Sequence, residues 1–222
     1  MVRGVIFDMD GLMLDTERLG TKMWKKAGEE MGIEIPIEFI DRFRGHNSAS
    51  VQKMFAERYG QEFDFEKCHQ IEIKSLDQYM KENGVPVKKG LICLLEYLSD
   101  SGIKMAVATS TQKNRAEWRL KEAGIFQYFQ TIVCGDMVER SKPYPDIFWC
   151  AAEKIQIPIQ ECLVLEDSPS GLGAAKASGA YAIHIPDVAY VPEEMKEGIT
   201  AEFDSLSEVI SWLEKENFDR HE

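Results

Sequence analysis

Four short groups of polar residues each follow an apolar run or a turn in this chain. The groups are Asp8 with Asp10, Thr109 with Ser110, Lys142, and Glu166 with Asp167. A carboxylate can act as a nucleophile or carry a proton, and carboxylates that cluster repel one another unless a cation lies among them. Because neither His nor Cys accompanies these groups, the oxygen-only ligand set favours Mg²⁺ over zinc. The residue types therefore predict a magnesium-dependent site.

The elements that would bring these groups together are short, β-rich apolar runs separated by helical patterns. The runs cover residues 2–7, 103–108, 131–133, 162–165 and 181–185. This alternation predicts an α/β fold, a doubly wound (Rossmann-like) parallel sheet with helices between its strands. Ligands of such sheets bind outside the carboxyl ends of the strands, where the polar groups follow. The sequence therefore places them at one edge of one sheet.

The segment from residue 15 to residue 84 has a different pattern. It shows helical periodicity over 19–31, 49–59 and 66–83, and no convincing buried strand. We expect an all-helical cap domain over 15–84, inserted into an α/β core formed by 1–14 and 85–222. A last amphipathic helix is expected after Ser205.

Composition and charge exclude several classes of protein. The chain has 26 basic and 38 acidic residues, a formal net charge of −12 and a sequence pI near 4.9. Such a surface repels nucleic acid and anionic lipid, and no apolar stretch reaches the roughly 18 residues that span a bilayer. Five scattered cysteines indicate reduced thiols. We therefore expect a cytoplasmic monomer with neither a nucleic-acid nor a membrane partner.

The motifs D-x-D-G-x-x-x-D-T-E from Asp8, T-S at Thr109, K-P-x-P-D from Lys142 and E-D-S from Glu166 occur in this order. Together they resemble the haloacid dehalogenase superfamily, and within it the β-phosphoglucomutase-like phosphatases with a helical cap. Each motif alone is weak evidence for the family. Lys142 taken alone, for example, would be an exposed loop lysine. The ordered set spans essentially the whole chain. The resemblance implies Mg²⁺-dependent hydrolysis of a small phosphorylated metabolite, such as a sugar phosphate.

The same resemblance implies a role for each core residue. Asp8 would be the nucleophile and form an aspartyl-phosphate, while Asp10 would be the general acid and base. Thr109 and the backbone N–H of Ser110 would bind the phosphoryl oxygens, and Lys142 would neutralise their charge.

The metal ligands implied by the resemblance are carboxylates and one backbone carbonyl. Mg²⁺ would be held by Asp8, the carbonyl of Asp10 and Asp167, with Glu166 next to or behind the ion.

The leaving group would be met by residues of the cap. Thr16 near the hinge and the loop residues Arg44, Gly45 and His46 are the candidate substrate-binding residues. Sugar-phosphate mutases of this family carry a histidine where this chain has Gly20, which favours a phosphatase. A β-phosphoglucomutase-type mutase and a non-catalytic phosphate-binding module stay open as alternatives.

Overall fold

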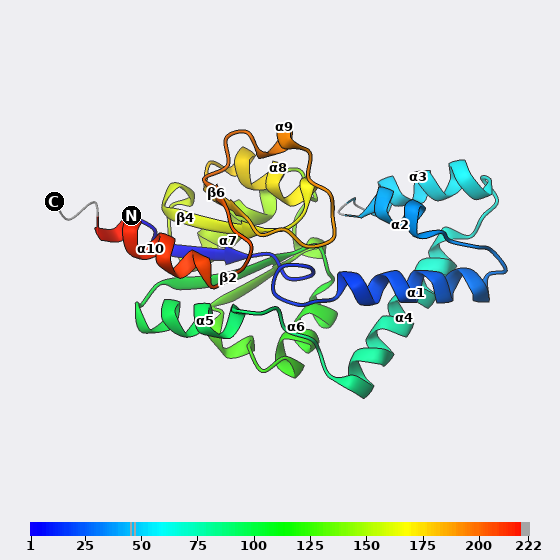
Figure 1. Ribbon diagram of the computed structural model, residues 1–222, viewed down its shortest axis with the longest axis horizontal. Helices are drawn as coiled ribbons and strands as arrows, with labels where there is room; N and C mark the ends of the chain where they lie inside the picture. Colours follow the sequence, from blue (N-terminus) through cyan, green and yellow to red (C-terminus); the bar gives the residue numbers. More distant parts are fainter. Residues whose placement is uncertain (45, 47, 219–222) are drawn as a thin grey trace.

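The computed structural model describes residues 1–44, 46 and 48–218, and a parallel sheet forms its centre (Figure 1). The six strands are β1 (Gly4–Phe7), β2 (Lys104–Thr109), β3 (Thr131–Cys134), β4 (Cys162–Glu166), β5 (Tyr181–His184) and β6 (Ala201–Glu202). Their spatial order is β3-β2-β1-β4-β5-β6, with every neighbouring pair parallel. Five of these strands are the predicted ones. The sixth was not predicted, because it is only two residues long.

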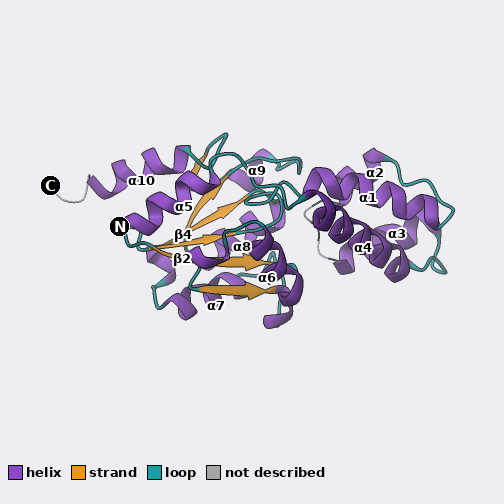
Figure 2. Cartoon of the chain, turned by 90° about the horizontal axis from the view of Figure 1, so that it is seen from below, coloured by secondary structure: helices purple, strands orange, loops and turns teal. Residues whose placement is uncertain are grey.

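Helices cover both faces of the sheet (Figure 2). They are α5 (Leu91–Asp100), α6 (Lys113–Glu122), α7 (Asp146–Ile155), α8 (Pro169–Ser178), α9 (Glu193–Lys196) and α10 (Glu208–Phe218). Short 3₁₀ turns are η1 (Phe126–Tyr128), η2 (Gly135–Met137) and η3 (Ile159–Glu161).

Alternate residues of one strand serve different faces of the sheet. Val5 and Phe7 belong to the apolar cluster with α5 and α10, whereas Ile6 belongs to the cluster with α7 and α8. This follows from the two-residue period of a strand, and burial on both faces explains why β1 is apolar throughout. The predicted doubly wound α/β core is therefore confirmed.

Four further helices lie beyond the carboxyl ends of the strands (Figure 2). They are α1 (Glu17–Glu30), α2 (Ile37–Phe43), α3 (Ser48–Tyr59) and α4 (Phe65–Asn83). They share an aromatic core of their own, in which the Trp24 ring lies 5.3 Å from the rings of Phe43 and Phe55. Three of the helices match the expected periodic segments. No separate signal in the sequence predicted α2, a helix of seven residues.

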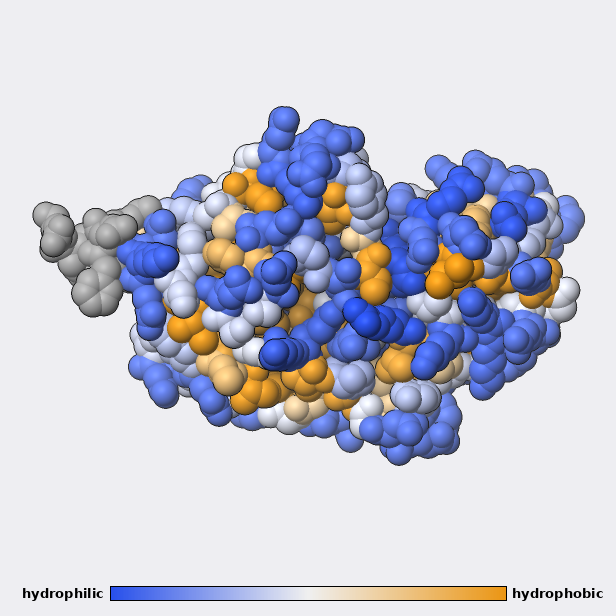
Figure 3. All heavy atoms as spheres, in the orientation of Figure 1, coloured by the Kyte–Doolittle hydropathy of each residue, from blue (hydrophilic) through white to orange (hydrophobic). Residues whose placement is uncertain are grey.

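The surface seen in Figure 3 is mostly hydrophilic, with apolar side chains scattered between charged ones. Within the described parts of the chain, no helix combines the length and hydropathy that crossing a bilayer requires. The five cysteines are free, and three of them are buried, as expected for reduced thiols.

Candidate active site

Three neighbouring strands deliver the central polar residues to one edge of the sheet. Thr109 is the last residue of β2, Glu166 is the last residue of β4, and Asp8 directly follows β1 between them. The parallel register pairs Phe7 with Val107 and with Leu165, so that the three strands end at the same level. This alignment places side chains from distant parts of the sequence beside one another.

Lys142 lies between two of these carboxylates. Its Nζ donates to Asp8 Oδ1 at 2.5 Å, to Glu166 Oε1 at 2.5 Å and to the carbonyl of Ala108 at 3.1 Å, and the residue is only 4% exposed. Burial alone would lower the pKa of Lys142, but Asp8 and Glu166 outweigh that effect and raise it. Burial raises the pKa of Asp8, an effect that Lys142 opposes. The lysine is therefore the positive charge at this centre.

A third carboxylate completes an acidic cluster. Oxygens of Asp8, Glu166 and Asp167 lie within 4.8 Å of one another, and all three residues are buried. Asp167 Oδ1 is buried without a hydrogen-bond partner. Burial, reinforced by the charges of Asp8 and Glu166, raises the pKa of Asp167 well above its usual range. A hard divalent cation fits such a set of oxygens and would relieve its repulsion.

The two oxygens of Glu166 are already held by the protein. Oε1 accepts from Lys142, and Oε2 accepts from the backbone N–H of Asp167 at 3.1 Å and from the N–H and Oγ of Ser168 at 3.2 and 3.1 Å. Asp8 and Asp167 thus offer freer oxygens to a cation than Glu166 does. Glu166 orients the lysine and the start of α8.

Two glycines make room for these carboxylates. Gly11 has φ +90°, and a Cβ there would overlap the carboxylate of Asp167. A Cβ at Gly171 would likewise overlap the carboxylate of Glu166. Both sites require a residue without a side chain, and the first also requires a backbone conformation that favours glycine.

Asp10 is held by three donors. Its Oδ1 accepts from Thr16 Oγ1 at 2.8 Å and from Arg119 Nη1 at 2.7 Å, and its Oδ2 accepts from Thr111 Oγ1 at 2.7 Å. Burial would raise the pKa of this carboxyl group, but Arg119 and the two hydroxyls outweigh it and lower the pKa. The structure thus shows Asp10 in the arrangement of an ionised carboxylate.

Arg119 and Thr111 were missed by the sequence analysis. Arg119 is 2% exposed and joins Asp10 across 109 residues of sequence. Its Nη2 also donates to Asp77 of α4 at 3.0 Å, and Asp77 receives two further bonds from Arg115. Arg115 and Arg119 are four residues apart and therefore lie on one face of α6. This spacing was the feature of the sequence that could have indicated a pair of arginines acting together. Their common partner lies in another helix and could not be read from that spacing.

Arg44 and His46, two candidate substrate-binding residues of the inserted helical segment, form their hydrogen bonds with residues outside the acidic cluster around Lys142. The guanidinium of Arg44 is bound to Glu17 at 3.2 Å, to Asp41 at 2.9 Å and to Thr21 at 2.5 Å. His46 is exposed, with Nδ1 3.2 Å from the carbonyl of Arg44.

The remaining substrate-binding candidates differ in position. Ser110 is exposed directly after β2, while Thr16 is buried against Asp10. Gly45 lies outside the described residues.

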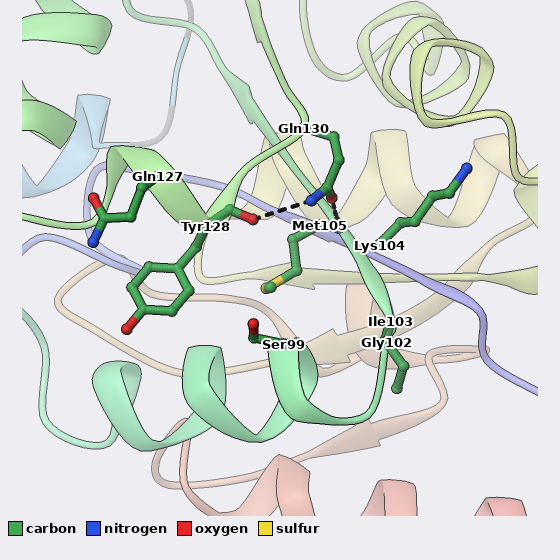
Figure 4. Close-up of a pocket in the computed structure, with 8 residues that line it drawn as sticks. All are labelled: Ser99, Gly102, Ile103, Lys104, Met105, Gln127, Tyr128 and Gln130. Atoms are coloured by element: carbon green, nitrogen blue, oxygen red, sulfur yellow. Dashed lines mark hydrogen bonds between the residues drawn. The ribbon is translucent and has the colours of Figure 1, made fainter.

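A cavity of about 380 Å³ lies elsewhere (Figure 4). Lys104, at the start of β2, lines it together with Met105, Tyr128 and Gln130. It therefore opens at the amino ends of the strands, opposite the carboxylate cluster, and it takes no part in that site.

The fold and the cluster at its strand ends define a known class of protein. A family model described as haloacid dehalogenase-like hydrolase matches residues 5–185. The chain belongs to this family, as its motifs indicated.

Individual relatives agree with this assignment. The chain is 30% identical over 187 residues to the phosphorylated carbohydrates phosphatase of Thermotoga maritima, a match that covers 82% of this chain and 84% of that protein. It is 34% identical over 189 residues to protein SUPPRESSOR OF QUENCHING 1, chloroplastic, of Arabidopsis thaliana; the match covers 83% of this chain but only 18% of that protein. The crystal structure of β-phosphoglucomutase from Clostridium difficile superimposes with a TM-score of 0.81 at 20% identity, covering 100% of this chain and 99% of the other. This last likeness shows that the two proteins share a fold.

Proposed function

We propose that this hydrolase is a phosphatase that uses Mg²⁺ to release phosphate from a small phosphorylated metabolite, through an aspartyl-phosphate on Asp8. The observation that carries the proposal is the pair formed by Asp8 and Lys142, whose atoms lie 2.5 Å apart in a buried site beside Asp10. An anionic nucleophile held by one lysine suits attack on an anionic phosphoryl group. The Thermotoga relative, named as a phosphatase, supports the same reaction class.

Each step uses a residue whose position has been described. A carboxylate oxygen of Asp8 attacks phosphorus and the bond from phosphorus to the alcohol oxygen breaks. Asp10 gives that oxygen a proton, so it has to enter this step protonated and not in the ionised form that its contacts favour without substrate. Water then attacks the aspartyl-phosphate while Asp10 takes up the proton, and free phosphate leaves. Thr109, the backbone N–H of Ser110 and Lys142 bind the phosphoryl oxygens during both steps.

The cation would be held by Asp8, Asp167 and the carbonyl of Asp10, with Glu166 beside it. When bound, Mg²⁺ supplies positive charge between the nucleophile and the phosphate. The unpartnered oxygen of Asp167 and the spacing of the three carboxylates support this assignment.

We also propose that residues 15–84 act as a cap over a core formed by 1–14 and 85–222. The separate aromatic cluster of the four helices supports this division. The bonds from Asp77 of α4 to Arg115 and Arg119 of α6 join the two parts directly above Asp10. A cap in this position would exclude water from the phosphoryl group.

The test is release of phosphate, with Mg²⁺, from a panel of sugar, nucleotide and small-acid phosphates. Asp8→Asn removes the nucleophile, so we expect a loss of at least ~10³-fold in kcat. Asp100→Asn, at an exposed position of α5, serves as the matched control.

Other outcomes would assign the chain differently. Phosphate release by Asp8→Asn at the wild-type rate, or none by either protein, would favour a phosphate-binding module. Conversion of glucose 1-phosphate to glucose 6-phosphate without free phosphate, in the presence of a trace of the 1,6-bisphosphate, would establish a mutase.

A further inference from the structure

The inserted helices help to hold Asp10 in place. Its Oδ1 accepts from the hydroxyl of Thr16, which directly precedes α1, and from Nη1 of Arg119 on α6. Nη2 of the same arginine donates to Asp77 of α4 at 3.0 Å. Helices α1 and α4 pack against each other. Of the three donors to Asp10 described above, Thr16 therefore belongs to the helical segment and Arg119 is bound to it.

The plane of the Arg119 guanidinium is set by two carboxylates. The side chain is only 3% exposed, and its buried Nε has no hydrogen-bond partner among the described residues. Its bonds to Asp10 at 2.7 Å and to Asp77 at 3.0 Å remain to orient it. Because a guanidinium is planar and rigid, a shift of Asp77 at one end is transmitted to Asp10 at the other.

Asp77 itself is held firmly against α6. Nε and Nη2 of Arg115 donate to its two carboxylate oxygens at 3.0 and 3.1 Å, a two-point ion pair. One helical turn further along α4, Nζ of Lys81 lies 5.7 Å from the centroid of the Trp118 ring on α6. The carboxylate of Asp77 is thus a fixed point against which Arg119 is placed.

We propose that Asp77 is a positioning residue for proton transfer by Asp10: acting through Arg119, it sets the place of the Asp10 carboxyl group. The inference rests on the proposed phosphatase activity and adds to it a residue that touches neither phosphate nor metal. The bonds to Asp10 can hold either of its forms, because a protonated carboxyl group still accepts hydrogen bonds. The helical segment thereby takes part in proton transfer as well as in excluding water.

The experiment compares two kinds of ester in Asp77→Asn, which keeps the size of the side chain but not its charge. An alkoxide needs a proton in order to leave, whereas p-nitrophenolate does not. We expect kcat/KM to fall about tenfold for the sugar or nucleotide phosphate that the wild type hydrolyses fastest, a part of the ~10²–10⁴ that acid catalysis supplies. For p-nitrophenyl phosphate, kcat/KM should stay within about twofold of the wild type, since its first step does not use Asp10 as an acid.

The matched control is Glu82→Gln, at an exposed position of the same helix, which should leave both values as in the wild type. The ratio of the two kcat/KM values does not depend on the folded fraction of a variant. Partial unfolding of Asp77→Asn therefore cannot imitate the expected result.

A double variant tests whether Asp77 acts through Asp10. Asp10→Asn already removes the acid, so adding Asp77→Asn should lower the residual kcat/KM for the sugar or nucleotide phosphate by less than about twofold. A contact that only supports the fold would lower it by the same factor in both backgrounds. This comparison decides the question even where p-nitrophenyl phosphate is a poor substrate.

Three results would overturn the inference. An equal loss on both esters would make Asp77 a structural contact only. An unchanged or higher kcat/KM for the sugar or nucleotide phosphate in Asp77→Asn would show that Asp10 is placed without Asp77, and a tenfold loss in the Asp10→Asn background would show that Asp77 acts by another route. No phosphate from any ester with the wild type would instead remove the proposed phosphatase and the inference with it.

Discussion

The candidate site has a phosphoryl side and a leaving-group side. The two sides differ in the secondary-structure elements that carry their residues and in how completely the charges of those residues are paired. On the phosphoryl side, strand ends hold Asp8 and Glu166, and one buried lysine binds both. On the leaving-group side, helices α1 and α4 carry Gly20 and Glu72, and the glutamate has no bonded partner among the described residues. The comparison indicates that the charges at the strand ends are paired within the protein, whereas the helices hold a buried carboxylate without a bonded partner among the described residues.

Rigidity explains this division. Parallel strands with both faces buried move little, so groups at their ends keep the positions that bond making requires. Helices α1 to α4 pack on an aromatic core of their own. The arginine pair on α6 links the two sides, because Arg119 binds Asp10 on one side and Asp77 on the other.

The largest effect is expected on the phosphoryl side, from Asp10→Asn. Asparagine cannot carry the proton, so turnover should fall about 10³-fold. With p-nitrophenyl phosphate the leaving group needs no proton, while hydrolysis of the aspartyl-phosphate still needs a base. A rapid-mixing experiment should therefore show a burst of nitrophenolate close to one equivalent of enzyme, followed by a stall.

The control for this variant is Asp100→Asn, which should turn over without a stall. Steady turnover by Asp10→Asn at the wild-type rate would refute the acid–base role of Asp10.

A smaller effect, on stability, is expected from Lys142→Met. Without the lysine, Asp8 and Glu166 remain buried beside each other without their shared cation. Leaving a buried charge uncompensated costs about 3 kcal/mol. Urea unfolding at pH 8 should show this loss, and added Mg²⁺ should recover more stability in the variant than in the wild type.

Lys154→Met, an exposed position on α7, should change the free energy of unfolding by less than about 0.5 kcal/mol. Equal stability of Lys142→Met and the wild type in the absence of Mg²⁺ would show that the lysine does not compensate the two carboxylates.

The phosphoryl side was also the more predictable of the two from sequence. Apolar runs end where buried strands end, so Asp8, Thr109 and Glu166 could be assigned to one edge of the sheet. The D-x-D-G motif also contains Gly11, and the space that this glycine leaves is filled by Asp167. Periodicity likewise predicted most of the helices inserted after β1.

The leaving-group side depends on contacts between helices, which periodicity does not specify. Asp10 and Arg119 meet across 109 residues, and nothing local to either residue indicates the other. Glu72 is indistinguishable in sequence from the exposed glutamates of its helix, because its burial depends on how α4 packs against α1. The seven-residue helix α2 was missed for a similar reason: its three buried residues contact a tertiary core, and the segment is too short to show a period.

The smallest effect, and the one that most sharpens the comparison, is the pH dependence of stability in Glu72→Gln. The folded-state pKa of Glu72, raised by burial to about 8 from an ordinary value of 4.5, means that the folded protein favours the protonated form. The wild type therefore loses stability as pH rises from about 4.5 to about 8, whereas glutamine does not titrate. We expect Glu72→Gln to match the wild type near pH 4.5 and to exceed it by about 2 kcal/mol at pH 8.5 in urea unfolding. Glu57→Gln, at an exposed position of α3, should show no such trend, and a Glu72→Gln protein less stable than the wild type at pH 8.5 would mean that the glutamate is compensated after all.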